Sequence, residues 1–318
     1  MAFSSLAGYN MHIMNKKALF GSVLLFTAAL VWGLAFVFQS QGMDNLPPFT
    51  FTAIRVGLAA AVVFLTQLIL EGKKGLKYDK KTVKAGVVCG LITFVVMAFQ
   101  QVGLVKTDPG KAGFITSLYI IIVPIFSRII LKKKESLRTW CGVAIGLVGL
   151  YLLCVQGNFS IVASDLAIML CAVFFALYVL YISEYCQEID SLSLNFIQLA
   201  ITSILSLVVA LIFEEPTLDG VVAAKIPILY CGIVSAGLGF TLQLVGQKSV
   251  NPTIAAVIMS FESVFSVLAG WLIMNSTLST RELLGCGIMF VANIIIQFPD
   301  KISYSDDLLR KQKDHPNV

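Results

Sequence analysis

Ten apolar runs, each about 18–25 residues long, occupy most of this 318-residue sequence. A helix needs about 20 predominantly apolar residues to cross the hydrocarbon core of a bilayer. The runs lie at residues 18–40, 48–70, 83–105, 110–131, 138–155, 164–186, 192–213, 225–247, 252–274 and 280–298. Because a helix satisfies its own backbone hydrogen bonds in lipid, these runs predict an all-α integral membrane protein with ten transmembrane helices.

The composition agrees with a membrane protein. Hydrophobic residues make up 58% of the chain and charged residues 13%, whereas soluble domains hold about 45–50% and about 25%. The net charge of +5 does not indicate nucleic-acid binding, because the Lys and Arg residues lie in short loops beside the apolar runs. The seven cysteines show no metal-ligand spacing, so we expect no metal and no cofactor.

The basic residues predict the orientation of the chain. If the runs cross the membrane in alternate directions, one side collects eighteen Lys and Arg residues and the other side four. The positive-inside rule then places both termini in the cytoplasm of a multi-pass plasma-membrane protein. The first apolar run lacks a cleavage-site pattern, so we read it as a retained span after a cytoplasmic segment at 1–17. The polar tail, 299–318, is expected to be disordered.

The two halves of the chain repeat each other at a shift of 143 residues. In this register Pro109 meets Pro252, Ala112 meets Ala255, Ser117 meets Ser260, Gln100 meets Gln243 and Gly142 meets Gly285. One register through both halves indicates a duplication, with repeats at 18–155 and 164–298. Each repeat holds five spans, and an odd number inverts the second repeat in the membrane. We therefore expect inverted repeats around a central cavity, with a binding site between them.

Glu262 is the only acid well inside a span. A charge in mid-span is costly, so such a residue usually faces a bundle interior or a water-filled path. At helical spacing Glu262 shares a small polar face with Ser263 and Ser266. It is either a proton acceptor or partner of a substrate amine, or a structural acid bonded to neighbouring serines.

Arg55 is the only basic residue well inside a span. Its guanidinium suits bidentate pairing with a substrate carboxylate. It is equally suited to a structural role against backbone carbonyls. A direct ion pair between Arg55 and Glu262 remains open from the sequence.

Polar, amide and aromatic side chains within other spans complete the candidate cavity. They are Thr116, Ser117, Tyr119, Asn195, Gln198, Gln100, Gln243, Trp32 and Tyr178. Tyr119 is the repeat partner of Glu262, which places it at the cavity by symmetry. The alternative for each is interhelical hydrogen bonding or plain packing without ligand contact. We also expect Pro124 to kink its helix.

Gly142, Gly146 and Gly149 have the small-residue spacing that lets helices approach closely. They fit internal packing or a dimer face, so the sequence allows a monomer or a homodimer.

Several of these stretches together resemble the EamA-type branch of the drug/metabolite transporter superfamily. They are Ala28–Gly33, Arg55, Lys111–Leu118, Gly142–Leu153 and Phe261–Phe265. The resemblance covers residues 18–298 and implies ten helices, a five-plus-five inverted repeat, a central cavity and transport of a small metabolite.

The function that these observations favour is secondary transport by alternating access. The expected cargo is a small polar or amphipathic metabolite, most plausibly amino-acid-like, moved outward, with protons as a candidate coupling ion. A facilitative exchanger and a non-transporting receptor or scaffold are the alternatives. An enzyme is disfavoured, because His12 and His315 lie in the terminal segments and no Gly-x-Ser-x-Gly or His-Glu-x-x-His motif occurs. No phosphate-binding loop supports an ATP-driven pump.

Overall fold

The computed structural model describes residues 2–72, 76, 78–107, 109–133, 135–154, 162–274 and 279–297. Within these ranges the chain is helical and contains no β-strand, as the sequence predicts. The tail predicted to be disordered, 299–318, lies outside the described residues.

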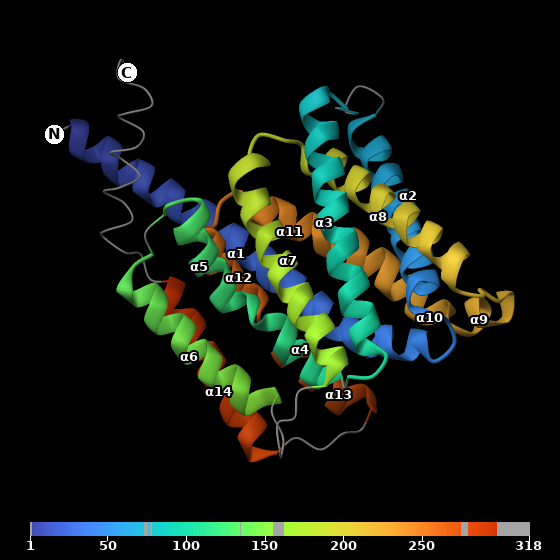
Figure 1. Cartoon of the computed structure of the whole chain (residues 1–318). Coiled ribbons are helices and arrows are strands. Elements are labelled where there is room, and N and C mark those ends of the chain that lie inside the picture. Colours follow the sequence, from blue (N-terminus) through green and yellow to red (C-terminus); the bar gives the residue numbers. More distant parts are fainter. Residues whose placement is uncertain are drawn as a thin grey trace.

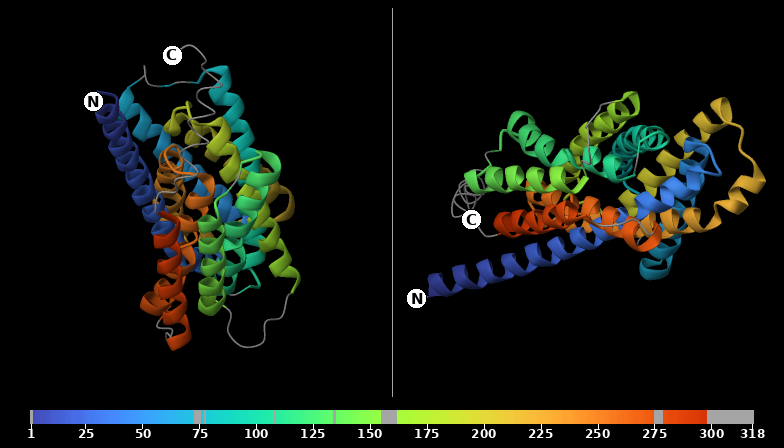
Figure 2. Two further views of the ribbon diagram at one scale, coloured as in Figure 1. Left: turned by 90° about the vertical axis from the view of Figure 1, so that its left-hand side faces the viewer. Right: turned by 90° about the horizontal axis from the view of Figure 1, so that it is seen from below.

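The helices form an elongated bundle (Figure 1). Their bounds are α1 Ala2–Met43, α2 Pro48–Glu71, α3 Lys80–Leu104, α4 Pro109–Ser117, α5 Tyr119–Ile130, α6 Leu137–Cys154, α7 Ala163–Tyr185, α8 Ser191–Phe213, α9 Leu218–Ala223, α10 Lys225–Leu229, the π-helix η2 Tyr230–Gly239, α11 Phe240–Gly246, α12 Pro252–Met259, α13 Glu262–Met274 and α14 Thr280–Gln297. The segment before residue 18 continues α1, which projects beyond the bundle at its N-terminal end (Figure 2).

Eight described segments are long and apolar enough to cross a membrane. They are Lys16–Met43, Pro48–Glu71, Lys80–Leu104, Lys111–Ile130, Ala163–Tyr185, Ser191–Phe213, Lys225–Gly246 and Pro252–Ile273. The runs predicted at 138–155 and 280–298 form α6 and α14, which are not among these eight. Large apolar side chains such as Ile69, Phe213 and Leu272 are exposed on the outside of the bundle, as a lipid-facing surface requires.

Helices from the two halves of the chain pack in pairs. α2 lies along α8 and α6 along α14, while α3 packs against both α7 and α8 (Figure 1). α1 crosses the middle of the bundle and contacts η2, α11, α12 and α13. The core between these helices therefore draws on both halves of the sequence.

The bundle has two distinct ends. The Pro48 end holds the α1–α2, α3–α4 and α8–α9 connections, where the carboxylate of Glu214 after α8 accepts hydrogen bonds from Phe49 N at 2.9 Å and Thr50 N at 2.7 Å. The Lys80 end holds the α2–α3, α5–α6 and α7–α8 connections. There Lys81 pairs with Glu188 at 2.8 Å.

Two of the spanning segments are interrupted at equivalent places. α4 gives way to α5 at Leu118, and α12 gives way to α13 beyond Ser260. Leu118 N bonds to Ile115 O, and Phe261 N bonds to Ile258 O, each at 3.2 Å and each one residue short of an α-helical bond. Leu118 and Phe261 correspond under the 143-residue shift. The irregularity in the first of these spans thus falls at Leu118, ahead of Pro124, which lies inside α5.

Candidate functional site

A cavity lies among α1, α2, α3, α4, α7, η2, α11 and α13. Its lining consists of Trp32, Ala35, Phe36, Gln39, Arg55, Val96, Met97, Gln100, Thr116, Cys171, Phe175, Ser235, Phe240 and Glu262. The centre of a water-sized sphere can occupy about 50 Å³ of it, which is room for a few water molecules. Gln39 near the end of α1, Gln100 near the end of α3 and Arg55 near the start of α2 place the cavity toward the Pro48 end.

Glu262 is the first residue of α13, directly after the interruption of its span. Its side chain lines the cavity and is 4% exposed. Ser117 Oγ lies 3.5 Å from Glu262 Oε1 and 2.6 Å from Ser263 Oγ, and Ser263 Oγ donates to Gly113 O at 3.0 Å. These serines join α4 to α13 and hold the carboxylate at the cavity wall.

Close approach of α1 brings Trp32 to the same wall. A Cβ atom at Gly33 would lie 2.7 Å from Glu262 O, so only glycine allows this contact between α1 and α13. Trp32 Nε1 donates to Ser235 O at 3.1 Å in the π-helix. The Trp32 ring contacts Phe240 at 5.2 Å between ring centroids, so the indole is fixed on both edges.

Tyr119, the predicted symmetry partner of Glu262, is fully buried beside it. Its hydroxyl makes no hydrogen bond of ordinary geometry within the described residues. Tyr119 is not part of the cavity lining. Its ring packs edge-on against the ring of the lining residue Phe175, with 4.8 Å between the ring centroids.

Arg55 is a buried cation that also lines the cavity. It is 2% exposed, and its Nη2 donates to Gln39 Oε1 at 3.2 Å and to Gln101 Oε1 at 3.4 Å. Arg55 and Glu262 line one cavity, yet within the described chain they form no ion pair with each other or with another residue. The cavity therefore carries one cation and one acid that are not neutralised by direct pairing.

The polar stripe on α8 is used for hydrogen bonds between helices. Tyr178 Oη donates to Gln198 Oε1 and Gln198 Nε2 to Asn195 Oδ1, both at 2.8 Å, while Asn195 Nδ2 donates to Thr241 Oγ1 at 2.7 Å. Asn195, Gln198 and Tyr178 lie outside the cavity lining in this conformation. In this conformation these residues form hydrogen bonds between helices without lining the cavity, which is the alternative that the sequence left open for them.

The remaining predicted residues divide between cavity and core. Thr116 and Gln100 line the cavity. Gln243 is fully buried, and neither end of its amide has a hydrogen-bond partner among the described residues. Ser266 is buried where α13 meets α1 near Gly33.

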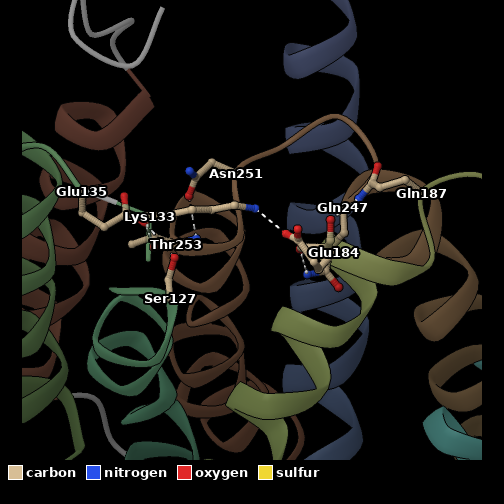
Figure 3. Close-up of polar contacts among 9 residues, drawn as sticks. Ser127, Lys133, Glu135, Glu184, Gln187, Gln247, Asn251 and Thr253 are labelled. Atoms are coloured by element: carbon tan, nitrogen blue, oxygen red, sulfur yellow. Dashed lines mark hydrogen bonds and ion pairs between the residues drawn. The ribbon is translucent and has the colours of Figure 1, made fainter. Parts of the chain in front are cut away.

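The path from the cavity to the Lys80 end is filled by side chains and then closed by polar contacts. Tyr178, Phe240, Leu244 and Met259 belong to one buried apolar cluster. Beyond it, Lys133 pairs with Glu184 at 2.6 Å, and Thr253 Oγ1 donates to Glu135 Oε1 at 2.8 Å (Figure 3). Burial raises the pKa of Glu135, against the opposing hydrogen bonds from Thr253 and Ser127.

Sequence reasoning missed several lining residues. Gln39 lies near a helix end, where an amide is unremarkable, and Cys171 and Ser235 are small residues in apolar runs. Phe175 had an available signal, because the 143-residue shift pairs it with the predicted residue Trp32. Phe240 pairs with Met97, which also lines the cavity and which the sequence did not indicate.

The fold and cavity define a helical multi-pass membrane protein with a cavity between its halves that is lined by one cation and one acid among apolar side chains. Comparison with protein families refines that class. The profile of the EamA-like transporter family matches residues 19–155 and again 162–298. The chain belongs to the EamA-like transporter family.

Individual relatives agree. An uncharacterized transporter of Archaeoglobus fulgidus is 30% identical over 280 residues, covering 88% of this chain and 86% of that protein. The uncharacterized inner membrane transporter YedA of Escherichia coli is 25% identical, covering 87% and 90% respectively. A solved structure described as "Crystal structure of protein" superposes with a TM-score of 0.73 at 20% identity, covering 87% of this chain and 96% of that one. That likeness concerns the fold.

Proposed function

We propose that this protein is a secondary transporter that moves a small polar or amphipathic, amino-acid-like metabolite across the plasma membrane by alternating access. The observation that carries the proposal is the cavity, which Glu262 and Arg55 both line without pairing. A buried charge without a counter-charge is costly. A zwitterionic cargo would supply both counter-charges at once.

The domain arrangement belongs to the same proposal, with ten transmembrane helices in two inverted repeats at 18–155 and 164–298. The two family matches, 19–155 and 162–298, support this division. Contacts between helices also recur after the halves are exchanged: α3 packs on α7 as η2 and α11 pack on α1, and α4 packs on α7 as α12 packs on α1. Five spans in each repeat would invert the second one.

Export is the proposed direction of transport, and it is stated for one proposed orientation of the chain. Lys80, Lys81, Lys84, Lys132 and Lys133 gather at the Lys80 end, so the positive-inside rule favours that end, with both termini, in the cytoplasm. The cavity would then lie on the outer side of a closed inner end, a state that follows release of an exported cargo. We propose a monomer or homodimer embedded in lipid as the working unit.

Glu262 is the proposed coupling site. Its polar neighbours among the described residues include the Ser117 hydroxyl at 3.5 Å and the hydroxyl of Tyr119, which are neutral and do not balance a full charge. It must therefore bind a proton or a cationic group of the cargo when it is shielded from water. A group that does both makes proton and cargo compete for one site, which is the basis of exchange.

The test uses purified protein in proteoliposomes and a radiolabelled mixture of proteinogenic amino acids. Wild-type protein should accumulate label when a proton gradient is imposed. Glu262→Gln keeps the shape and hydrogen bonding of the side chain but cannot titrate, so it should lose proton-driven accumulation and keep counterflow exchange.

Full proton-driven accumulation by Glu262→Gln would reject the coupling role. Equal exchange by both proteins with no response to the gradient would instead identify a facilitative exchanger. Absence of any labelled flux, with the protein shown to be folded by gel filtration, would contradict amino-acid transport and favour the receptor alternative.

A further inference from the structure

The guanidinium of Arg55 is a buried cation with unused hydrogen-bond donors. Nη2 is bonded to Gln39 Oε1 and Gln101 Oε1, while Nε is buried and has no partner within the described chain. Arginine has five N–H donors, so the two glutamines leave Nε–H and the Nη1 hydrogens free. A buried donor without an acceptor destabilises the protein, and more so when it carries charge.

The surroundings of Arg55 do not neutralise its charge. Both glutamine side chains are neutral amides, and the centroid of the uncharged Phe51 ring lies 5.5 Å from Arg55 Cζ. Gln101 is itself held, because its Nε2 lies 2.8 Å from Met43 Sδ. The guanidinium is therefore hydrogen-bonded through Nη2, and its other nitrogens have no partner within the described chain.

A ligand in the cavity can approach the guanidinium, since Arg55 and Gln39 both form part of the cavity lining. The group that would satisfy the free donors must be an anionic acceptor. Both bidentate edges of a guanidinium include Nη2, whose two hydrogens bind the glutamines, so the ligand accepts single charge-assisted hydrogen bonds from the remaining nitrogens. Arg55 is the only cation of the lining and faces a single acid, Glu262. A singly charged carboxylate balances it, whereas a doubly charged phosphate leaves an excess of negative charge.

We propose that Arg55 is the receptor for a carboxylate group of the transported metabolite, and that Gln39 and Gln101 are positioning residues that set the specificity for it. The inference rests on the proposed transport function and adds the chemical group that the cargo must carry. Neutral amides in these two positions hold the guanidinium in place while leaving its charge for the ligand.

Binding to purified full-length protein tests the proposal without requiring transport. Melting temperature is followed while each proteinogenic amino acid, and separately its amide, is titrated. The acid and its amide share a side chain and an amine, so the comparison isolates the carboxylate. At least one acid should stabilise wild-type protein more than its amide does.

Three variants locate the effect. Arg55→Gln should weaken binding of that acid by roughly tenfold to a hundredfold, the loss expected for hydrogen bonds to a charged group, and leave binding of the amide unchanged. Gln101→Leu should weaken binding of the acid severalfold, because the hydrogen bond between Arg55 and residue 101 is lost. Gln39→Glu places a carboxylate against Arg55, so it should raise the melting temperature without ligand and still weaken binding of the acid.

Gln41→Glu is the matched control, since it makes the same substitution on α1 at a residue that does not bond to Arg55. It should bind the acid as wild-type protein does. A purely structural role for Gln39 would not predict that a more stable variant binds the acid less tightly.

Three results would overturn the proposal: no acid stabilises the protein more than its amide, Arg55→Gln binds the acid as wild-type does, or sodium chloride at equal concentration gives the same stabilisation. Failure of this proposal is distinct from failure of the transport function. Labelled flux in proteoliposomes that is unaffected by Arg55→Gln would keep transport and reject the carboxylate receptor. Arg55-dependent binding without flux would do the reverse.

Discussion

Glu214→Ala should destabilise the folded protein, because one carboxylate ties the two halves of the chain together. Glu214 follows α8, and its Oε1 and Oε2 accept hydrogen bonds from Phe49 N and Thr50 N at the start of α2. Thr50 Oγ1 adds a third bond at 2.7 Å. A carboxylate at a helix N-terminus also interacts favourably with the helix dipole.

The magnitude follows from those contacts. A hydrogen bond to a charged group contributes about 1.5–3 kcal/mol, and the N-terminal dipole adds about 0.3–1 kcal/mol. Two backbone donors lose their acceptor in Glu214→Ala, although the site is only part-buried and water replaces some of the loss. We expect the free energy of unfolding to fall by about 2–4 kcal/mol. Glu214→Gln should recover less than half, since its NH₂ group would face one of the two N–H donors.

Equilibrium unfolding in mixed micelles, followed by circular dichroism over a denaturant series, measures the change. Glu215→Ala is the matched control: the same substitution one residue further on, at an exposed side chain. It should leave the free energy of unfolding within about 0.5 kcal/mol of wild type. If Glu214→Ala and Glu215→Ala unfold alike, the carboxylate does not hold α8 to α2 and the argument from these bonds is wrong.

Two further predictions concern the Lys80 end and the α6–α14 pair. Burial raises the pKa of Glu135 above its ordinary value of 4.5, so the folded state holds this proton more tightly than the unfolded state. The stability that protonated Glu135 contributes is complete below pH 4.5 and is lost as pH rises through the folded pKa. The melting temperature of Glu135→Gln, relative to that of the wild-type protein, should therefore increase with rising pH. A difference between the two melting temperatures that is constant with pH would contradict this. Gly149→Val should lower the melting temperature, because a Cβ there would lie 2.8 Å from Met289 Cγ and 2.9 Å from Met289 N, whereas Gly287→Ala, with nothing within 4 Å, should be neutral. Overpacking of this kind costs about 1–3 kcal/mol, and a Gly149→Val protein that melts normally but changes oligomeric state in gel filtration would indicate a dimer face instead.

Part of this site can be predicted from the charged residues of the sequence. Glu262 and Arg55 stand out because ionisable residues in mid-span are costly, and both line the cavity. Gly142 and Gly149 predict close helix packing, and both contact α14. These inferences depend on residue type alone.

Other features depend on geometry that residue type does not encode. Gln39 and Gln101 surround Arg55 from two other helices, and no spacing within one helix reveals such a contact. No Pro or Gly lies between Thr253 and Ala269, so no residue near the interruption at Phe261 distinguishes it from continuous helix. The stripe on α8 has the composition of a cavity wall, yet Tyr178 and Thr241 are placed to satisfy it.

The paired interruptions at Leu118 and Phe261 have a mechanical consequence. A continuous series of i→i−4 backbone hydrogen bonds makes a helix stiff, and the change to i→i−3 bonds at Leu118 and Phe261 interrupts that series and provides a joint. Each half of the chain has one such joint at the equivalent position. Tyr119 is the first residue after the joint in the first half, and Glu262 is the first residue after the joint in the second half. Each of these two segments can therefore bend at its own joint independently of the other, and binding at the Glu262 carboxylate acts directly on the residue that begins α13.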